Sequence, residues 1–205
     1  MILNEFRKNQ SGITLIETLV AASILIIGIV GALILTTYSI QVSEVSKQEL
    51  IATNLAREGL EVVRNIRDTE WLDPSNPAWM DGIVGPGDTI YVVPIFDPAT
   101  GEWTLLDITG SESNCDQRAT TEACRVVFHD NDAGVDPMYL QYDSGVSSYD
   151  ESDLLGYSRY IEIEDNSPDE KIHVTATVYY KGFSRSGAVF NNKIEISEDL
   201  TNWHE

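Results

Sequence analysis

Glu17 is a single carboxylate at the edge of a long apolar run. From Thr18 to Ser43 no charged residue occurs, and most of these 26 residues are Ile, Leu, Val or Ala. A helix of about 20 apolar residues crosses a bilayer, so the run is long enough to span one. An ionised side chain at such an edge either leans out to the headgroups or pairs with a cation in an apolar setting. Position alone leaves both interpretations open.

The residues before the run carry positive charge and a glycine. The segment Met1 to Gly12 is short and polar and contains Arg7 and Lys8, a flank that keeps this end of a membrane segment in the cytoplasm. A secretory signal peptide has a shorter apolar core, about 7–15 residues, and a polar chain after its cleavage site. Cleavage at the small residues Ala21 to Ser23 would leave a hydrophobic new terminus. We therefore exclude ordinary secretion.

The stretch Gly12-Ile13-Thr14-Leu15-Ile16-Glu17 resembles the cleavage and N-methylation signal of type IV prepilins and of the related pseudopilins of type II secretion. The resemblance implies that a prepilin peptidase cuts between Gly12 and Ile13 and methylates the new amino group of Ile13. It also implies that Glu17 is the assembly carboxylate. The family commonly has Phe after the cut, and this chain has Ile13, a departure that leaves the mechanism unchanged.

Ion pairing gives Glu17 a physical role within that resemblance. A cut after Gly12 would leave an ammonium or methylammonium group at Ile13, and Glu17 of a neighbouring subunit can neutralise it. Two charges in an apolar setting are each costly alone, and pairing recovers much of the desolvation cost at one axial stagger between subunits. Glu17 is then a register device for assembly.

After the apolar run the pattern becomes amphipathic and stays helical, with no proline from Ile13 to Asp68. One face is apolar: Val45, Ala52, Leu55, Ala56, Gly59, Val62, Val63 and Ile66. The other face is charged: Glu44, Lys47, Arg57, Glu58, Glu61, Arg64 and Asp68. A signal anchor followed by an ordinary core helix would show the same pattern, so this alternative stays open.

Beyond residue 70 the composition shifts to turn residues and to alternating patterns typical of strands. Thr89 to Ile95 and Glu102 to Ile108 predict a hairpin, and Arg125 to Phe128 predicts a short strand. The alternation from Ile172 to Tyr180, flanked by shorter runs at 159–163 and 190–196, predicts three antiparallel strands. The expected fold class is α+β: a long N-terminal helix, membrane-spanning in its first half and amphipathic in its second, packed on a C-terminal antiparallel β-sheet domain.

This pattern predicts four parts of the chain. Residues 1–12 are a prepilin leader and 13–43 a transmembrane and assembly helix. Residues 44–70 continue it as an amphipathic helix into the globular head, and 71–205 form an extracytoplasmic β-rich domain.

Cys115 and Cys124 are the two cysteines of the chain, and they enclose eight residues. On the outer side of a membrane so close a pair predicts a disulfide that closes one loop. Two thiolates without a nearby Cys or His pair make only half a zinc site. Free thiols are expected instead if the domain stays inside the cell.

Asp130, Asp132 and Asp136, with Gly134 among them, resemble an acidic calcium loop. The match to an EF-hand fails, because glycine occupies the fifth place and Gln141 stands at the twelfth, where a bidentate Glu belongs. A solvated turn and a calcium site both stay open. No other cofactor is expected.

Net charge and missing motifs exclude several classes of function. The formal net charge is −20, with only 13 Lys and Arg and no basic stripe, so we expect no nucleic-acid partner. The chain has no His-Glu-x-x-His, Gly-x-Ser-x-Gly or phosphate-binding loop, and its three histidines are scattered. We therefore expect no catalytic residues and no enzyme activity.

The sequence thus predicts a minor pilin or pseudopilin of a type IV pilus or a type II secretion pseudopilus. Its expected partners are prepilin peptidase, other pilin subunits and the cytoplasmic membrane. The precursor would cross that membrane once with its N-terminus inside, and the assembled subunit would lie outside it or at the cell surface. The alternative is a monomeric, single-pass membrane-anchored extracytoplasmic binding module that keeps its leader.

Overall fold

The computed structural model describes residues 14–72, 83–97, 101–111, 115, 124–127, 154–165, 171–182 and 189–201 of the chain. By internal contacts the chain divides into two compact units, Met1–Glu44 and Val45–Glu205. Helix α1 (Leu15–Trp71) contributes residues to both, and the described strands all belong to the second unit.

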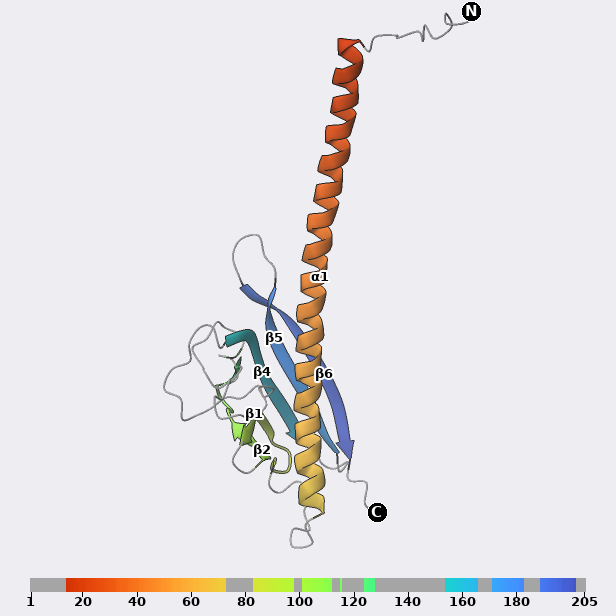
Figure 1. Ribbon diagram of the computed structural model, residues 1–205. Coiled ribbons are helices and arrows are strands. Elements are labelled where there is room, and N and C mark those ends of the chain that lie inside the picture. The colour runs from red at the N-terminus through yellow and green to blue at the C-terminus, as the bar shows by residue number, and fades with distance from the viewer. Residues whose placement is uncertain are drawn as a thin grey trace, which may run out of the picture. The chain divides into compact units, whose positions relative to one another are not determined.

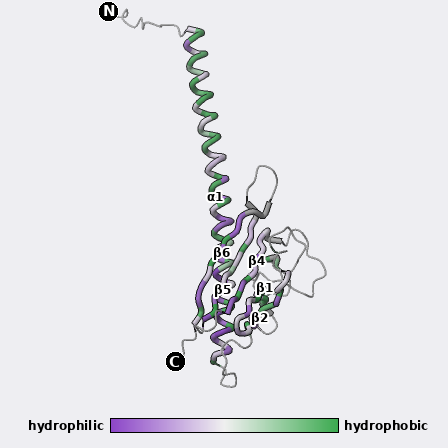
Figure 2. The backbone as a smooth tube through the Cα atoms, turned by 180° about the vertical axis from the view of Figure 1, so that it is seen from behind, coloured by the Kyte–Doolittle hydropathy of each residue, from purple (hydrophilic) through white to green (hydrophobic). Residues whose placement is uncertain are grey.

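In the first unit the described chain is almost entirely helix. All of its described side chains are exposed, including the large apolar ones from Leu15 to Val42. Figure 2 shows this part of α1 mainly in the colours of hydrophobic residues, and the part of α1 that follows in mixed colours. The change matches the shift from an uninterrupted apolar run to an amphipathic pattern.

The second unit contains an antiparallel sheet (Figure 1). Its strands are β1 (Thr89–Asp97), β2 (Glu102–Asp107), β3 (Arg125–Val127), β4 (Leu154–Asp165), β5 (Lys171–Gly182) and β6 (Val189–Thr201). The strand order is β2-β1-β4-β5-β6, and β3 pairs with β4. Strand β4 uses one edge twice: Ser158 pairs with β3, and Ile161 to Glu164 pair with β1.

The predicted strands and fold class are confirmed. β1 and β2 form the expected hairpin, with Val92 opposite Asp107 and Asp97 opposite Glu102. β4, β5 and β6 form the expected antiparallel trio. β4 and β6 are longer than the alternating runs predicted, because polar residues outside those runs, such as Ser158, Asp165 and Asp199, also pair in the ladder.

The main core lies between the second half of α1 and one face of the sheet. The buried helix residues are Ala52, Leu55, Ala56, Gly59, Leu60, Val62, Val63 and Arg67. Side chains of the same parity on the strands meet them: Ile161 and Ile163 on β4, Ile172, Val174, Ala176, Val178 and Tyr180 on β5, and Leu200 on β6. Leu60 and Arg67 are buried in addition to the predicted face, and Val45 and Ile66 are only half-buried.

A second, smaller core lies on the opposite face of β1 and β4, where the alternate residues of these strands point. Val93, Ile108, Cys115 and Cys124 are buried there, with Tyr91, Leu106 and Tyr160 packed against them. Ser158 on β4 is also buried, although its neighbours Tyr157 and Arg159 point to the main core. Both faces of this part of the sheet are therefore covered.

Candidate functional site

The first turn of α1 is organised around Thr14. The carbonyl oxygen of Thr14 accepts hydrogen bonds from the backbone N–H of Glu17, at 3.0 Å, and of Thr18, at 3.3 Å. Thr14 is thus the N-cap, and Glu17 stands three residues later, the spacing of a Thr-x-x-Glu capping box. A carboxylate in the first turn is also favoured by the positive end of the helix dipole. The sequence contained this signal, and our prediction of an assembly role overlooked it.

Glu17 is exposed, and within the part of the chain that the structure describes it forms no ion pair. Gly12 and Ile13 lie outside the described residues, so the cut and the methylated residue stay predictions. The pairing of Glu17 with a cation of a neighbouring subunit likewise stays a prediction.

Four hydroxyl groups of the apolar run donate hydrogen bonds to carbonyl groups of the same helix. Thr18 and Ser23 donate hydroxyl hydrogen bonds to the carbonyls of Leu15 and Leu19, both at 2.8 Å. Further along, Thr36 donates to Ala32 at 2.8 Å and Thr37 to Ile34 at 2.9 Å. A polar group exposed to lipid must find its partner within the protein. These hydroxyl groups are therefore compatible with a bilayer.

Among the described residues, α1 is long and apolar enough to cross a membrane. A core helix of a soluble protein can meet the same criterion, but its apolar stretch would be buried, and here the stretch is exposed. A signal sequence near an N-terminus also meets this criterion. The residues around the start of the helix are therefore needed to distinguish a signal sequence from an anchor.

Residues 7–33 match the family model of the prokaryotic N-terminal methylation motif. The chain carries a type IV pilin signal. The predicted resemblance is confirmed, and the motif supports a place in the type IV pilin-like and pseudopilin family, which is structural rather than enzymatic. The signal implies processing by prepilin peptidase, assembly with pilins and, with the apolar helix, membrane anchoring before assembly. Comparisons with curated proteins and with solved structures found no match.

In the second unit, a buried arginine joins the helix to the centre of the sheet. Arg159 on β4 is 2% exposed, and its Nη1 donates to the carbonyl of Leu55 at 2.9 Å and to Glu58 Oε1 at 3.3 Å. Burial lowers the pKa of Arg159, and the nearby Glu58 carboxylate opposes that shift. The alternating run contained this signal, since Arg159 has the parity of Ile161 and Ile163 and a cation on a buried face needs a partner.

Two arginines of α1 also connect the helix to the sheet, in this case to β6. Arg64 forms ion pairs with Glu198 and with Glu61, and the hydrogen bond to Glu198 is the main cause of its raised pKa. Arg67 is buried, binds Asp68 and donates to the carbonyl of Thr201 at 3.4 Å. The end of β6 is therefore tied to the last turns of the helix by charge as well as by apolar contact.

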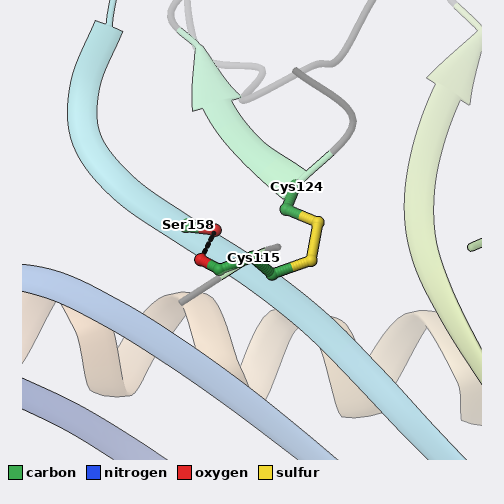
Figure 3. The surroundings of a disulfide bond; sticks show 3 residues. All are labelled: Cys115, Cys124 and Ser158. Carbon is green, nitrogen blue, oxygen red and sulfur yellow. Dashed lines mark hydrogen bonds between the residues drawn. A yellow bond between two sulfur atoms is a disulfide. The ribbon is translucent and has the colours of Figure 1, made fainter. Parts of the chain in front are cut away.

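The two cysteines form a disulfide, with 5.5 Å between their Cα atoms (Figure 3). Cys124 directly precedes β3, and the Ser158 hydroxyl of β4 donates to the carbonyl of Cys115 at 2.9 Å. The disulfide thus joins Cys115, which is hydrogen-bonded to Ser158 of β4, to the residue that precedes β3, and β3 pairs with the same part of β4.

Asp130, Asp132 and Asp136 lie outside the described residues, so the calcium site stays a prediction. Among the residues that are described, no group of three or more His, Cys, Asp or Glu side chains could hold a metal ion. His173 pairs with Asp199, with 2.6 Å between Nδ1 and Oδ1, on the exposed face of β5 and β6.

Proposed function

We propose that this chain is a minor pilin or pseudopilin, cleaved between Gly12 and Ile13, methylated at Ile13 and assembled through α1 into a type IV pilus or a type II secretion pseudopilus. The observation that supports it is a coincidence of position. The methylation motif covers residues 7–33, and the first turn of α1 within it carries Glu17, the one carboxylate before 26 uncharged residues.

The steps follow from charge. Before cleavage, Arg7 and Lys8 hold the leader in the cytoplasm, and α1 inserts with the second unit outside. Cleavage creates a cationic terminus at Ile13 in an apolar setting. Glu17 of the adjacent subunit neutralises it, because an unpaired charge there is far costlier than a paired one. The subunit carries no catalytic role, and calcium at Asp130, Asp132 and Asp136 remains an accompanying proposal.

The test compares Glu17→Gln with the matched control Glu44→Gln, since both carboxylates are exposed on α1. Gln keeps the size of Glu and removes its charge. Leaving the cation of Ile13 unpaired should cost about 3–5 kcal/mol for each subunit contact. We expect Glu17→Gln to insert and to be cleaved normally but to be lost from sheared filaments, and Glu44→Gln to be incorporated like wild type.

Two results would contradict the proposal. Equal incorporation of Glu17→Gln and wild type would remove the pairing role of the carboxylate. An intact Met1, found by mass spectrometry in cells with an active prepilin peptidase, would favour the alternative of an anchored binding module.

A further inference from the structure

The helix face that packs on the sheet contains a row of small side chains beside the larger Leu55 and Leu60. Ala52, Ala56, Gly59 and Val63 follow one another at intervals of three or four residues, and all are buried. They meet a row of apolar side chains on β5 that runs from Ile172 to Tyr180. Apolar burial is not directional, and one turn of a helix advances it by about 5.4 Å. Sliding the helix by one turn would therefore still bury apolar side chains, although it would bring a residue with a Cβ to the place of Gly59.

Arg159 opposes such a displacement. Its guanidinium is buried, and its two partners on α1 lie at the Leu55 carbonyl, 2.9 Å away, and at Glu58, 3.3 Å away. One turn from Glu58 the chain offers Asn54, Leu55, Glu61 and Val62. Only Glu61 is acidic, and it already binds Arg64. A displaced helix would leave a buried cation without its carboxylate.

Gly59 reports the position of the helix directly. A Cβ at Gly59 would lie 3.1 Å from Ile161 Cδ1 and 3.6 Å from Arg159 Cδ, so the helix backbone touches β4 beside the arginine. The ion pair and the closest backbone contact therefore occupy the same point of the interface.

We propose that Arg159 is a positioning residue that selects one axial and rotational position of α1 on the sheet. Apolar packing supplies most of the attraction, and the buried guanidinium adds a directional contact that a displaced helix cannot repeat. Single buried polar residues fix register in packed helices in the same way. The inference concerns the second unit and is independent of the proposed function.

The test uses the full chain in detergent micelles, with labelled Ile δ1 methyl groups and protonated glycine. In wild type the δ1 methyl group of Ile161 should give a nuclear Overhauser cross-peak to the α-protons of Gly59. We expect Arg159→Met, which keeps the length and removes the charge, to lose this cross-peak or to split the Ile161 signal into several. Arg64→Met removes another arginine between helix and sheet, and should keep a single signal and the cross-peak.

A second variant guards against loss of folding. Replacing both partners, Arg159→Met with Glu58→Leu, removes the whole ion pair, and such apolar replacements are commonly tolerated. Loss or splitting of the signal in a folded protein supports the proposal. A single Ile161 signal with the wild-type cross-peak in either folded variant overturns it. If both variants fail to fold, the pair is needed for folding itself and selects nothing, which overturns it as well.

Discussion

At position 59 a hydrogen atom stands where any other residue would place a carbon against β4. The nearest heavy atom to that place is Ile161 Cδ1, at 3.1 Å. A single methyl group can be admitted if the end of the isoleucine yields by a few tenths of an ångström. A branched side chain has no such escape, because the interface around it is fully buried.

We therefore expect Gly59→Val to lower the free energy of unfolding by about 1–3 kcal/mol, the usual cost of overpacking a core. Gly59→Ala is the matched control. Its gain in helix propensity, about 1 kcal/mol, should offset the crowding and leave the stability near that of wild type. Chemical denaturation followed by far-UV circular dichroism measures both. Equal stability of the valine variant and wild type would contradict the close contact.

Gly12 is the residue whose size should decide processing. The peptidase must hold the residue before the cut in a narrow site, so we expect Gly12→Val to accumulate as uncleaved precursor in a prepilin-processing host. Gly28→Ala is the control, because an added Cβ at Gly28 meets nothing within 4 Å in this chain. Immunoblotting separates the two forms by length. Normal maturation of Gly12→Val would remove the case for cleavage there.

Single residues differed in how far the sequence could predict them. The pattern around Glu17 was specific enough to identify the methylation motif, because basic leader, glycine, acid and apolar run had to coincide. The partners of Arg159 could not be predicted, since they lie 101 and 104 residues away in the sequence. Only the fold brings Leu55 and Glu58 to β4.

At the scale of elements, α1 is one helix whose two parts differ in side-chain exposure. Its first part keeps apolar side chains exposed, and four of its hydroxyl groups donate to its own backbone. Its later part buries one face against a sheet. The periodicity predicted both parts. It could not predict the burial of Arg67, because a charged residue on the apolar edge is recognisable only when its partners on β6 are known.

The last turn of α1 contains a carboxylate, Glu70, whose burial lowers the stability of the folded state when it is ionised. Oε2 of Glu70 is buried without a hydrogen-bond partner among the described residues, and burial raises the pKa of Glu70 above its usual 4.5. The folded state therefore holds this proton more tightly than the unfolded state does. The ionised carboxylate costs stability at neutral pH, and the cost disappears as the pH falls through the titration range of Glu70.

We expect Glu70→Gln to raise the melting temperature at pH 7, since the amide needs no desolvation of a charge. The difference from wild type should shrink as the pH falls through the titration range of Glu70, because burial raises its pKa and the protonated side chain carries no charge to desolvate. Thermal scans across pH 4–7 measure it, with Glu44→Gln as an exposed control on the same helix. A constant difference at every pH would show that ionisation of Glu70 is not its cause.

At the scale of the whole second unit, the sheet has a main core on one face and a smaller one on part of the other. The disulfide belongs to the smaller one, where few apolar side chains are available. A disulfide in this position contributes to the free energy of unfolding chiefly by restricting the unfolded chain.

We expect the double variant Cys115→Ser, Cys124→Ser to lower the free energy of unfolding by about 2–3 kcal/mol, the value for so short a loop. A reductant should bring wild type down to the same stability and leave the double variant unchanged. Denaturation with and without reductant measures this. Equal stability of the two proteins under oxidising conditions would contradict the contribution of the bridge.

Strand pairing was predictable where strands follow one another closely and not where they are distant. The hairpin of β1 with β2 and the β4–β5–β6 trio followed from alternation and short connections. The placement of β1 against β4 did not, because Ile90 and Ile163 are 73 residues apart and many pairings would bury them equally well. The double use of one edge of β4 was likewise beyond any local pattern.

The edge of β4 that pairs with both β1 and β3 has a consequence for inserting extra residues between β3 and β4. Val127 of β3 lies opposite Leu154 of β4, so the two described residues on either side of positions 128–153 are neighbours in the sheet. The entropy of closing a loop rises only with the logarithm of its length, and the ladder on either side fixes both ends. An epitope or a small domain grafted between these strands would be displayed by the sheet without changing a single strand pairing.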